Sequence, residues 1–199
     1  MAFQPTLSKF GVPLVAGSSG IGMLQPKFKH RFRVSLQNFG PIGSALDITR
    51  QVMKVGRPSL TTPESSATSY NNIMYFAGRP EWQTITFSVR DDVNNSASRL
   101  VGAQLQKQMN HFDQTSPLAG INYKFFMQIE ALDGGIDGVL ENWYLEGCWL
   151  PSVSYDEFDY GDATGYLDIN MTVRFDNATQ DQTIMPASQP PTAAGVLLG

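Results

Sequence analysis

The pattern of apolar and polar positions is clearest near the end of the chain, at residues 165–177. Apolar and polar side chains alternate there without a break. The apolar positions are Leu167, Ile169, Met171, Val173 and Phe175, and the polar ones are Asp168, Asn170, Thr172 and Arg174. Because successive side chains of a strand point to opposite faces, this period of two predicts a half-buried β-strand.

Similar alternation recurs along the chain and predicts further strands. In residues 27–36 one face carries apolar side chains and the other is basic, and residues 81–90 place Ile85, Phe87 and Val89 opposite threonine and serine. Weaker strand patterns lie at 45–55, 70–77 and 123–132. Aspartate and glycine at 133–138 suit a turn into a strand at 139–149.

One segment has helical spacing. Asp91, Asp92 and residues 94–96 offer N-caps, and a helix is predicted near 95–112. Its apolar positions are Leu100, Val101, Leu105, Met109 and Phe112. Many strands and one helix predict a mainly β (α+β) domain, an antiparallel β-sandwich or barrel with one flanking α-helix and extended terminal arms.

The two ends of the chain differ from its middle. Residues 1–26 are rich in glycine and proline, and residues 177–199 form a Pro/Ala-rich tail. Both ends carry scattered apolar residues, which a neighbouring subunit would order; simple terminal disorder is the alternative. The β domain is therefore expected to span residues 27–176.

The composition excludes several classes of protein. The net charge is −4, so there is no bulk attraction to nucleic acid, and only 16% of the residues are charged, which favours self-assembly weakly. No stretch approaches a membrane span, and the N-terminus lacks the order of a signal peptide. The single cysteine, Cys148, rules out an internal disulfide and is expected to be a small buried residue.

The residues that usually carry catalysis form no recognisable constellation. His30 and His111 lack metal-ligand spacing, and the glycine-rich residues 17–22 follow no strand and lack the lysine of a phosphate loop. The acidic run of Asp156, Glu157, Asp159 and Asp162 lacks the glycine and glutamate of a calcium loop. The sequence therefore predicts no enzyme, no cofactor and no metal site.

A basic stripe at Lys27, Lys29, Arg31 and Arg33 allows two interpretations. One basic strand face could bind single-stranded nucleic acid, but the aromatic residues needed for stacking lie on the opposite face. Pairing with the acidic residues Asp156, Glu157 and Asp159, within or between subunits, is the simpler hypothesis.

Three stretches carry a resemblance to the tail tube protein family of contractile-tailed bacteriophages. Residues 71–109 read strand, Ala-Gly, Trp, alternating strand, Asp-Asp and helix. Residues 145–167 (LEGCWLPSVSYDEFDYGDATGYL) combine a Leu-x-Gly-x-aromatic-x-Pro strand end with an acidic loop, and residues 167–177 (LDINMTVRFDN) form the closing strand. The order of these motifs, more than any one of them, is similar to that family.

The resemblance implies a major tail tube subunit that forms hexameric rings stacked into a hollow tube, through which the genome passes. Implied partners are copies of the chain itself, the tail sheath, baseplate and tail-terminator proteins, and, transiently in the lumen, the tape measure protein and DNA. The expected location is the virion tail, assembled in the host bacterial cytoplasm. Alternatives are a tube-end or baseplate protein, the inner tube of a contractile secretion apparatus, and, from another class, a nucleic-acid-binding β-barrel.

The candidate interface lies in the long excursion at residues 56–80. We expect Tyr70, Ile73, Tyr75 and Phe76 to pack between subunits; the alternative is a hairpin folded on its own core. A lumen that conducts DNA should be neutral or negative, because each phosphate contact would retard the polymer. The basic stripe should then face a neighbour or the outside, and Asp168, Asn170, Thr172 and Arg174 become candidates for a ring surface.

Overall fold

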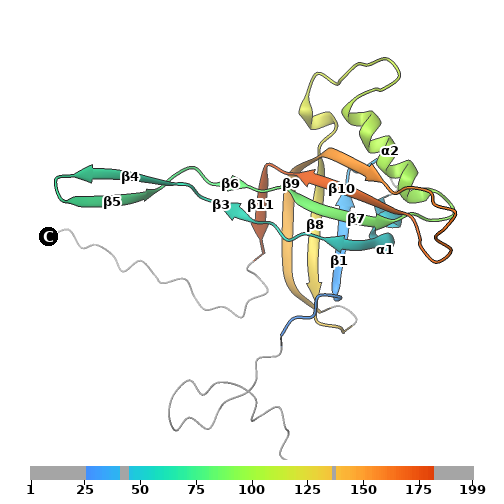
Figure 1. Ribbon diagram of the computed structural model, residues 1–199, viewed down its shortest axis with the longest axis horizontal. Helices are drawn as coiled ribbons and strands as arrows, with labels where there is room; N and C mark the ends of the chain where they lie inside the picture. The colour runs from blue at the N-terminus through green and yellow to red at the C-terminus, as the bar shows by residue number, and fades with distance from the viewer. Residues whose placement is uncertain (1–25, 41–44, 136–137, 182–199) are drawn as a thin grey trace, which may run out of the picture. The chain divides into compact units, whose positions relative to one another are not determined.

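The computed structural model describes residues 26–40, 45–135 and 138–181 (Figure 1). It divides the chain into two compact units, Met1–Arg31 and Phe32–Gly199. In the first unit, the described residues 26–31 contain a turn and no strand.

The second unit contains the helices and strands. In chain order they are β1 (Phe32–Gln37), α1 (Ala45–Gln51), β2 (Val52–Val55), β3 (Leu60–Thr61), β4 (Glu64–Ser69), β5 (Asn72–Ala77), β6 (Glu81–Trp82), β7 (Ile85–Arg90), α2 (Ser96–Gln108), β8 (Phe125–Leu132), β9 (Val139–Tyr155), β10 (Asp168–Arg174) and β11 (Asn177–Gln180). A 3₁₀ turn at Gly120–Asn122 precedes β8.

The main sheet is antiparallel and has the strand order β1-β8-β9-β10-β7-β2, with β11 also pairing with β9. Two small ladders, β3 with β6 and β4 with β5, interrupt the chain between β2 and β7. The prediction of a mainly β, antiparallel fold is confirmed.

The long strand β9 links the two halves of this sheet. One of its edges pairs with β8, and the other pairs first with β11 and then with β10. Gly147 lies on β9 between the residues that pair with β11 and those that pair with β10. Its φ is 66, a left-handed conformation that glycine adopts without strain. The β8–β9 ladder shifts register there, between Leu145 and Cys148, and the Asp176 N–H donates to the Glu146 carbonyl at 3.0 Å. A bulge of this kind bends the strand, so that one chain segment serves both halves.

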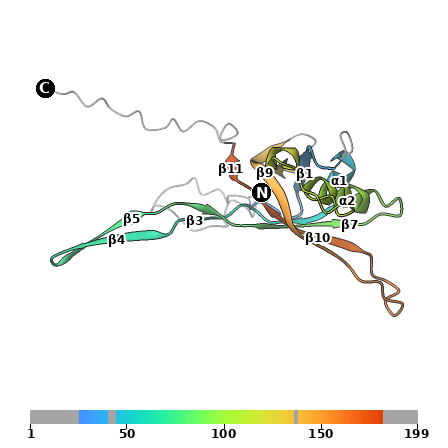
Figure 2. The same cartoon turned by 90° about the horizontal axis from the view of Figure 1, so that it is seen from above.

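The core lies where the alternating apolar faces meet α2. Phe87, Met171 and Phe125 are almost completely buried, and Leu100 and Val101 of α2 pack into the same cluster. Figure 2 shows α1 and α2 next to each other beside β1. Buried Gln104 of α2 accepts a hydrogen bond from the Gly40 N–H and donates one to the Tyr123 carbonyl, which ties the helix to the neighbouring loops.

Several predicted elements are confirmed. In β10, Ile169, Met171 and Val173 are buried as expected, and β7 buries every second residue from Ile85. Cys148 is fully buried. Helix α2 begins at Ser96 with Asn95 at its N-cap position, within the predicted 94–96; the Asn95 side chain makes no capping hydrogen bond, and Asp92 accepts instead from the backbone N–H and the hydroxyl of Ser96.

The predicted strand at 27–36 is wrong in its first half. β1 begins only at Phe32, and residues 26–31 contain a turn closed by the Arg31 N–H on the Phe28 carbonyl. The reason is that β1 pairs with β8, and β8 ends at Leu132, opposite the start of β1. The residues before Phe32 therefore have no strand of β8 to pair with. The four basic residues therefore do not share one strand face.

The predicted strand at 45–55 is also wrong in its first half, where residues 45–51 form helix α1. Ile48 of this helix is completely buried. Over so short a segment, alternation does not distinguish a strand from a helix whose packing decides the matter.

The predicted helix near 95–112 ends earlier, at Gln108. Met109 and Phe112 lie outside it, and Phe112 is 94% exposed. The turn at 110–115, closed by the Asn110 N–H on the Thr115 carbonyl, ends the helix before those positions.

The boundaries near the end of the chain also differ from the prediction. The Leu-x-Gly-x-aromatic-x-Pro motif is not a strand end, since β9 continues to Tyr155. Residues 177–180, which the sequence assigns to the tail, form β11. Residues 1–25 and 182–199 lie outside the described residues, so the rest of both predicted arms is not tested.

Candidate subunit interface

The β4–β5 hairpin is the main candidate site, and it is exposed on both faces. All six residues of each strand are exposed, although Ile73, Met74, Tyr75 and Phe76 are large and apolar. Figure 1 shows the hairpin extending beyond β3 and β6, away from the main sheet. A hairpin with two strands is marginal alone in water, and consecutive apolar residues in a strand are typical of one that is covered on both faces.

The sequence predicted the second strand of this hairpin but not the first. Residues 70–77 read as a strand, and β5 covers most of them. β4 has the sequence ESSATS, which carries no apolar face. Its pairing with β5, from Glu64 opposite Ala77 to Ser69 opposite Asn72, is what makes it a strand.

Tyr70 lies in the turn between the two strands and is fully exposed at 102%. Its φ is 53, in the left-handed region, which costs a residue with a side chain roughly 1–2 kcal/mol. The next residue is Asn71, of a type that tolerates this conformation far better. The turn therefore holds an aromatic side chain outward at the expense of backbone strain.

An ion pair lies on the segment between β2 and the hairpin. Arg57, just after β2, forms an ion pair with Glu141, whose side chain is only 5% exposed. The Trp143 indole N–H also donates to that carboxylate, at 2.6 Å. A buried carboxylate needs such partners, and the ion pair joins the segment that leads to the hairpin to β9.

The acidic candidates Asp156, Glu157 and Asp159 lie in the loop between β9 and β10. They are exposed, and the turn at Asp162 holds the end of this loop in shape. Hydrogen bonds from the Thr164 N–H, the Gly165 N–H and the Thr164 hydroxyl lower the pKa of the Asp162 carboxyl below its usual value.

This loop and the hairpin lie at opposite ends of β7. Asp168, which follows the loop, pairs with Arg90 at one end of that strand, whereas the hairpin returns at Ile85. The structure therefore does not bring the acidic candidates and the hairpin candidates together within one chain.

The basic candidates are also separated. Lys29 and Arg31 belong to the first unit, where the Arg31 guanidinium lies 5.0 Å from the Phe28 ring centroid. Arg33 lies on β1 and pairs with Glu130, whose side chain is 10% exposed. A single basic stripe, as the nucleic-acid hypothesis requires, is thus absent from the described residues.

The outward face of β9, β10 and β7 carries two rows of small uncharged polar side chains. Asn170 lies between Ser154 and Ser88, and Thr172 lies between Ser152 and Thr86. Asp168 and Arg174 lie at the two ends of β10, outside these rows. The polar face predicted for this strand is therefore part of a wider surface that is uncharged at its centre.

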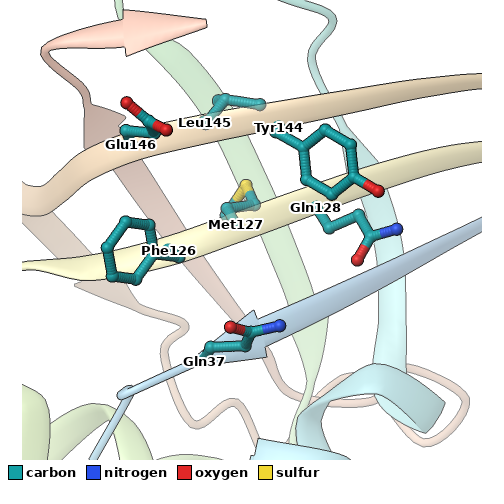
Figure 3. A pocket seen from close by; sticks show the side chains of 7 residues that line it. All are labelled: Gln37, Phe126, Met127, Gln128, Tyr144, Leu145 and Glu146. Atoms are coloured by element: carbon teal, nitrogen blue, oxygen red, sulfur yellow. The ribbon is translucent and has the colours of Figure 1, made fainter. Parts of the chain in front are cut away.

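A shallow groove on the outer side of β1, β8 and β9 was not predicted (Figure 3). It has a volume of about 180 Å³. Its lining residues are Gln37, Phe126, Met127, Gln128, Tyr144, Leu145 and Glu146. The signal was present in the sequence as Phe126 and Tyr144 on the polar faces of their strands, but only the register of β8 on β9 brings them to one place.

The described residues offer neither a cluster of metal ligands nor a reactive thiol. They contain no group of three or more histidine, cysteine, aspartate or glutamate residues that could hold a metal ion. Burial raises the pKa of the Cys148 thiol to about 12, so it is a poor nucleophile near neutral pH. In the ranges with described structure, no helix is long and apolar enough to span a membrane.

Comparison with solved structures identifies the fold. No protein-family model matches this sequence, and no curated protein matches it. Solved structures do match. The tube-terminating cap of the anti-feeding prophage has a TM-score of 0.61 at 15% identity, over 81% of this chain and 94% of that chain.

Two structures of an extracellular contractile injection system, PVC, match as well. A chain of its sheath/tube terminator has a TM-score of 0.56 at 14% identity, over 80% of this chain and 99% of that chain. A chain of its sheath–tube complex has a TM-score of 0.55 at 16% identity, over 78% of this chain and 91% of that chain. The chain therefore has the fold of tube and cap proteins of contractile injection systems, as the resemblance predicted.

Proposed function

We propose that this chain is a structural protein, the subunit of a tail tube, and that copies of it form hexameric rings that stack into a hollow tube. The observation that carries the proposal is the β4–β5 hairpin, whose large apolar side chains are exposed on both faces. Exposed apolar surface of this extent is typical of a protein interaction site. Head-to-tail contacts between identical subunits close into rings when the rotation closes.

The proposal extends to the lumen and the partners. The uncharged rows around Asn170 and Thr172 suit a wall along which a polyanion moves without being held. The chain would thus conduct the phage genome, with the tape measure protein in the lumen before ejection. The sheath, baseplate and tail-terminator proteins would be its partners in the virion tail, and assembly would take place in the host cytoplasm.

The test is electron microscopy of the purified chain and of a charged hairpin variant. Wild-type protein should form tubes of stacked rings. The double variant Ile73→Asp and Tyr75→Asp should remain folded and soluble but form no tubes, because buried unpaired carboxylates would be placed in the contact. The matched control, Val93→Asp with Asn94→Asp, adds the same charge at an exposed turn and should assemble normally.

Other outcomes point to the alternatives. Isolated rings that do not stack would indicate a tube-end, baseplate or secretion-apparatus component. Monomers that bind DNA with a strong dependence on salt would indicate the nucleic-acid-binding class. Tubes formed equally well by the charged hairpin variant would show that the hairpin is not the contact.

A further inference from the structure

The tip of the hairpin and the groove on the main sheet are complementary in shape and chemistry. Tyr70 is the most exposed aromatic residue of the hairpin, and its strained backbone indicates that its side chain is the reason for its position. An asparagine or glycine would suit the turn better, so a role for the phenol ring is the simplest explanation.

The groove offers apolar walls on a rigid floor. Met127 and Leu145 form the floor and are each 1% exposed, whereas the walls, Phe126 and Tyr144, are 51% and 42% exposed. In Figure 3 the two aromatic rings lie on either side of Met127. Half of each aromatic side chain is therefore left uncovered in the free chain.

Polar groups border the groove. Gln128 is held in place, since its amide donates to Glu130 at 3.1 Å and accepts from the Ser35 hydroxyl at 3.4 Å. Gln37 and Glu146 lie at the rim with oxygen atoms that can accept a hydrogen bond. Apolar walls with a few acceptors at the rim are what a phenol requires, because its ring is apolar and its hydroxyl donates.

The size also fits. The volume of about 180 Å³ exceeds the roughly 150 Å³ of an engineered cavity that binds benzene. A phenol ring can therefore enter without displacing the floor.

We infer that this groove receives Tyr70 from a second copy of the same chain. The inference rests on the proposed self-assembly and names the surface that the hairpin tip contacts. Tyr70 does not fill the groove of its own chain, since it is fully exposed there. Each copy then offers one tip and one groove, a head-to-tail contact that repeats from subunit to subunit.

The test is photo-crosslinking in assembled full-length protein. Tyr70 is replaced by p-benzoylphenylalanine, and this protein is mixed with unmodified copies that carry a heavy-isotope label. After illumination, mass spectrometry should find Tyr70 peptides joined to labelled peptides that contain residues 125–132 or 139–148. Crosslinks to any other segment would overturn the inference.

A reciprocal experiment identifies the occupant from the side of the groove. With p-benzoylphenylalanine in place of Tyr144, the crosslinked peptide should contain Tyr70 of another copy. Crosslinks to residues 1–25 or 182–199, or to a different part of the hairpin, would show that another segment fills the groove and would contradict the assignment.

A variant that blocks the groove tests how far the Tyr70 crosslinks depend on it. Gln37→Trp places a large side chain in the groove from its exposed rim and should lower the yield of Tyr70 crosslinks at least tenfold. The control Arg99→Trp adds the same side chain on the exposed side of α2 and should leave the yield unchanged. An unchanged yield in Gln37→Trp would overturn the contact.

The two proposals fail in different ways. Wild-type chain that forms tubes while Tyr70 crosslinks elsewhere contradicts only the groove contact. Wild-type chain that forms no assembly at any concentration contradicts the proposed function, and the groove contact with it.

Discussion

Two antiparallel ladders in this chain have the same hydrogen-bonding pattern but opposite surroundings. The β7–β10 ladder pairs six residues with six, and so does the β4–β5 ladder. The first buries every second side chain, from Ile85 and Ile169 onward, whereas the second buries none. Backbone pairing therefore makes the strand in both places, but burial of side chains stabilises it only in the β7–β10 ladder.

The largest expected effect on stability comes from replacing a phenylalanine by alanine, once in the buried ladder and once in the exposed hairpin. Phe87→Ala should lower the free energy of unfolding by about 3–5 kcal/mol, because it leaves a cavity in the core. Phe76→Ala, in the hairpin, should change the stability of the dilute chain by less than about 0.5 kcal/mol. Urea denaturation measures both. Equal losses would mean that the hairpin packs within its own chain.

A smaller effect is expected at the bulge that lets β9 serve both halves of the main sheet. Gly147→Ala should cost about 2 kcal/mol, because φ is 66 and the new Cβ would collide with the Asp176 carboxylate. The control is Gly102→Ala in α2, where the added Cβ meets no atom within 4 Å; it should stabilise the chain by about 0.5–1 kcal/mol. Denaturant midpoints compare the two, and a neutral Gly147→Ala would contradict the role of the bulge.

A substitution in the hairpin turn should raise the stability of the hairpin, whereas the core and bulge substitutions lower the stability of the chain. Tyr70→Asn relieves left-handed strain and should stabilise the hairpin of the free chain by about 1 kcal/mol. Hydrogen exchange of the β4 and β5 amides should then slow by about fivefold in dilute protein. The same change should weaken assembly, so faster exchange or unaffected tube formation would argue against a functional Tyr70.

The smallest effect concerns the pH dependence of α2. Hydrogen bonds from the Ser96 hydroxyl and from the Ser96 and Ala97 N–H groups lower the pKa of Asp92 below 3.8. The carboxylate therefore stabilises the folded chain above about pH 3.8, and that contribution is lost as the pH falls through the lower folded value. The difference in unfolding free energy between wild type and Asp92→Asn should shrink on acidification below that pH. A difference that stays constant with pH would show that the charge is not involved.

Prediction from sequence succeeded where a local pattern had to be satisfied by burial. The faces of β7 and β10 follow from alternation, the start of α2 from the polar residues before it, and the burial of Cys148 from its residue type. It failed where a neighbour decided the outcome. β4 has no apolar face and is a strand only because β5 pairs with it, and α1 is helical although its alternation suits a strand equally well.

The candidate site divides in the same way. The strand at 70–77 was predicted, and the residues named there as interface candidates are exposed together on β5 and in the turn before it, whereas the pairing with β4 was not predicted. The basic stripe was not reproduced, because β8 ends opposite the start of β1. The groove was missed because Phe126 and Tyr144 are far apart in the sequence, and only strand register brings them to the same groove.

The sequence by itself determined which side chains must leave water, because the period of two fixes the faces of a strand wherever it folds. Tertiary structure alone decided which strands lie next to one another, where β9 bends, and that the side chains of the apolar hairpin are exposed among the described residues. The physical reason is that burial depends on contacts between distant segments. A local pattern shows which face of a strand must be covered but not which segment covers it.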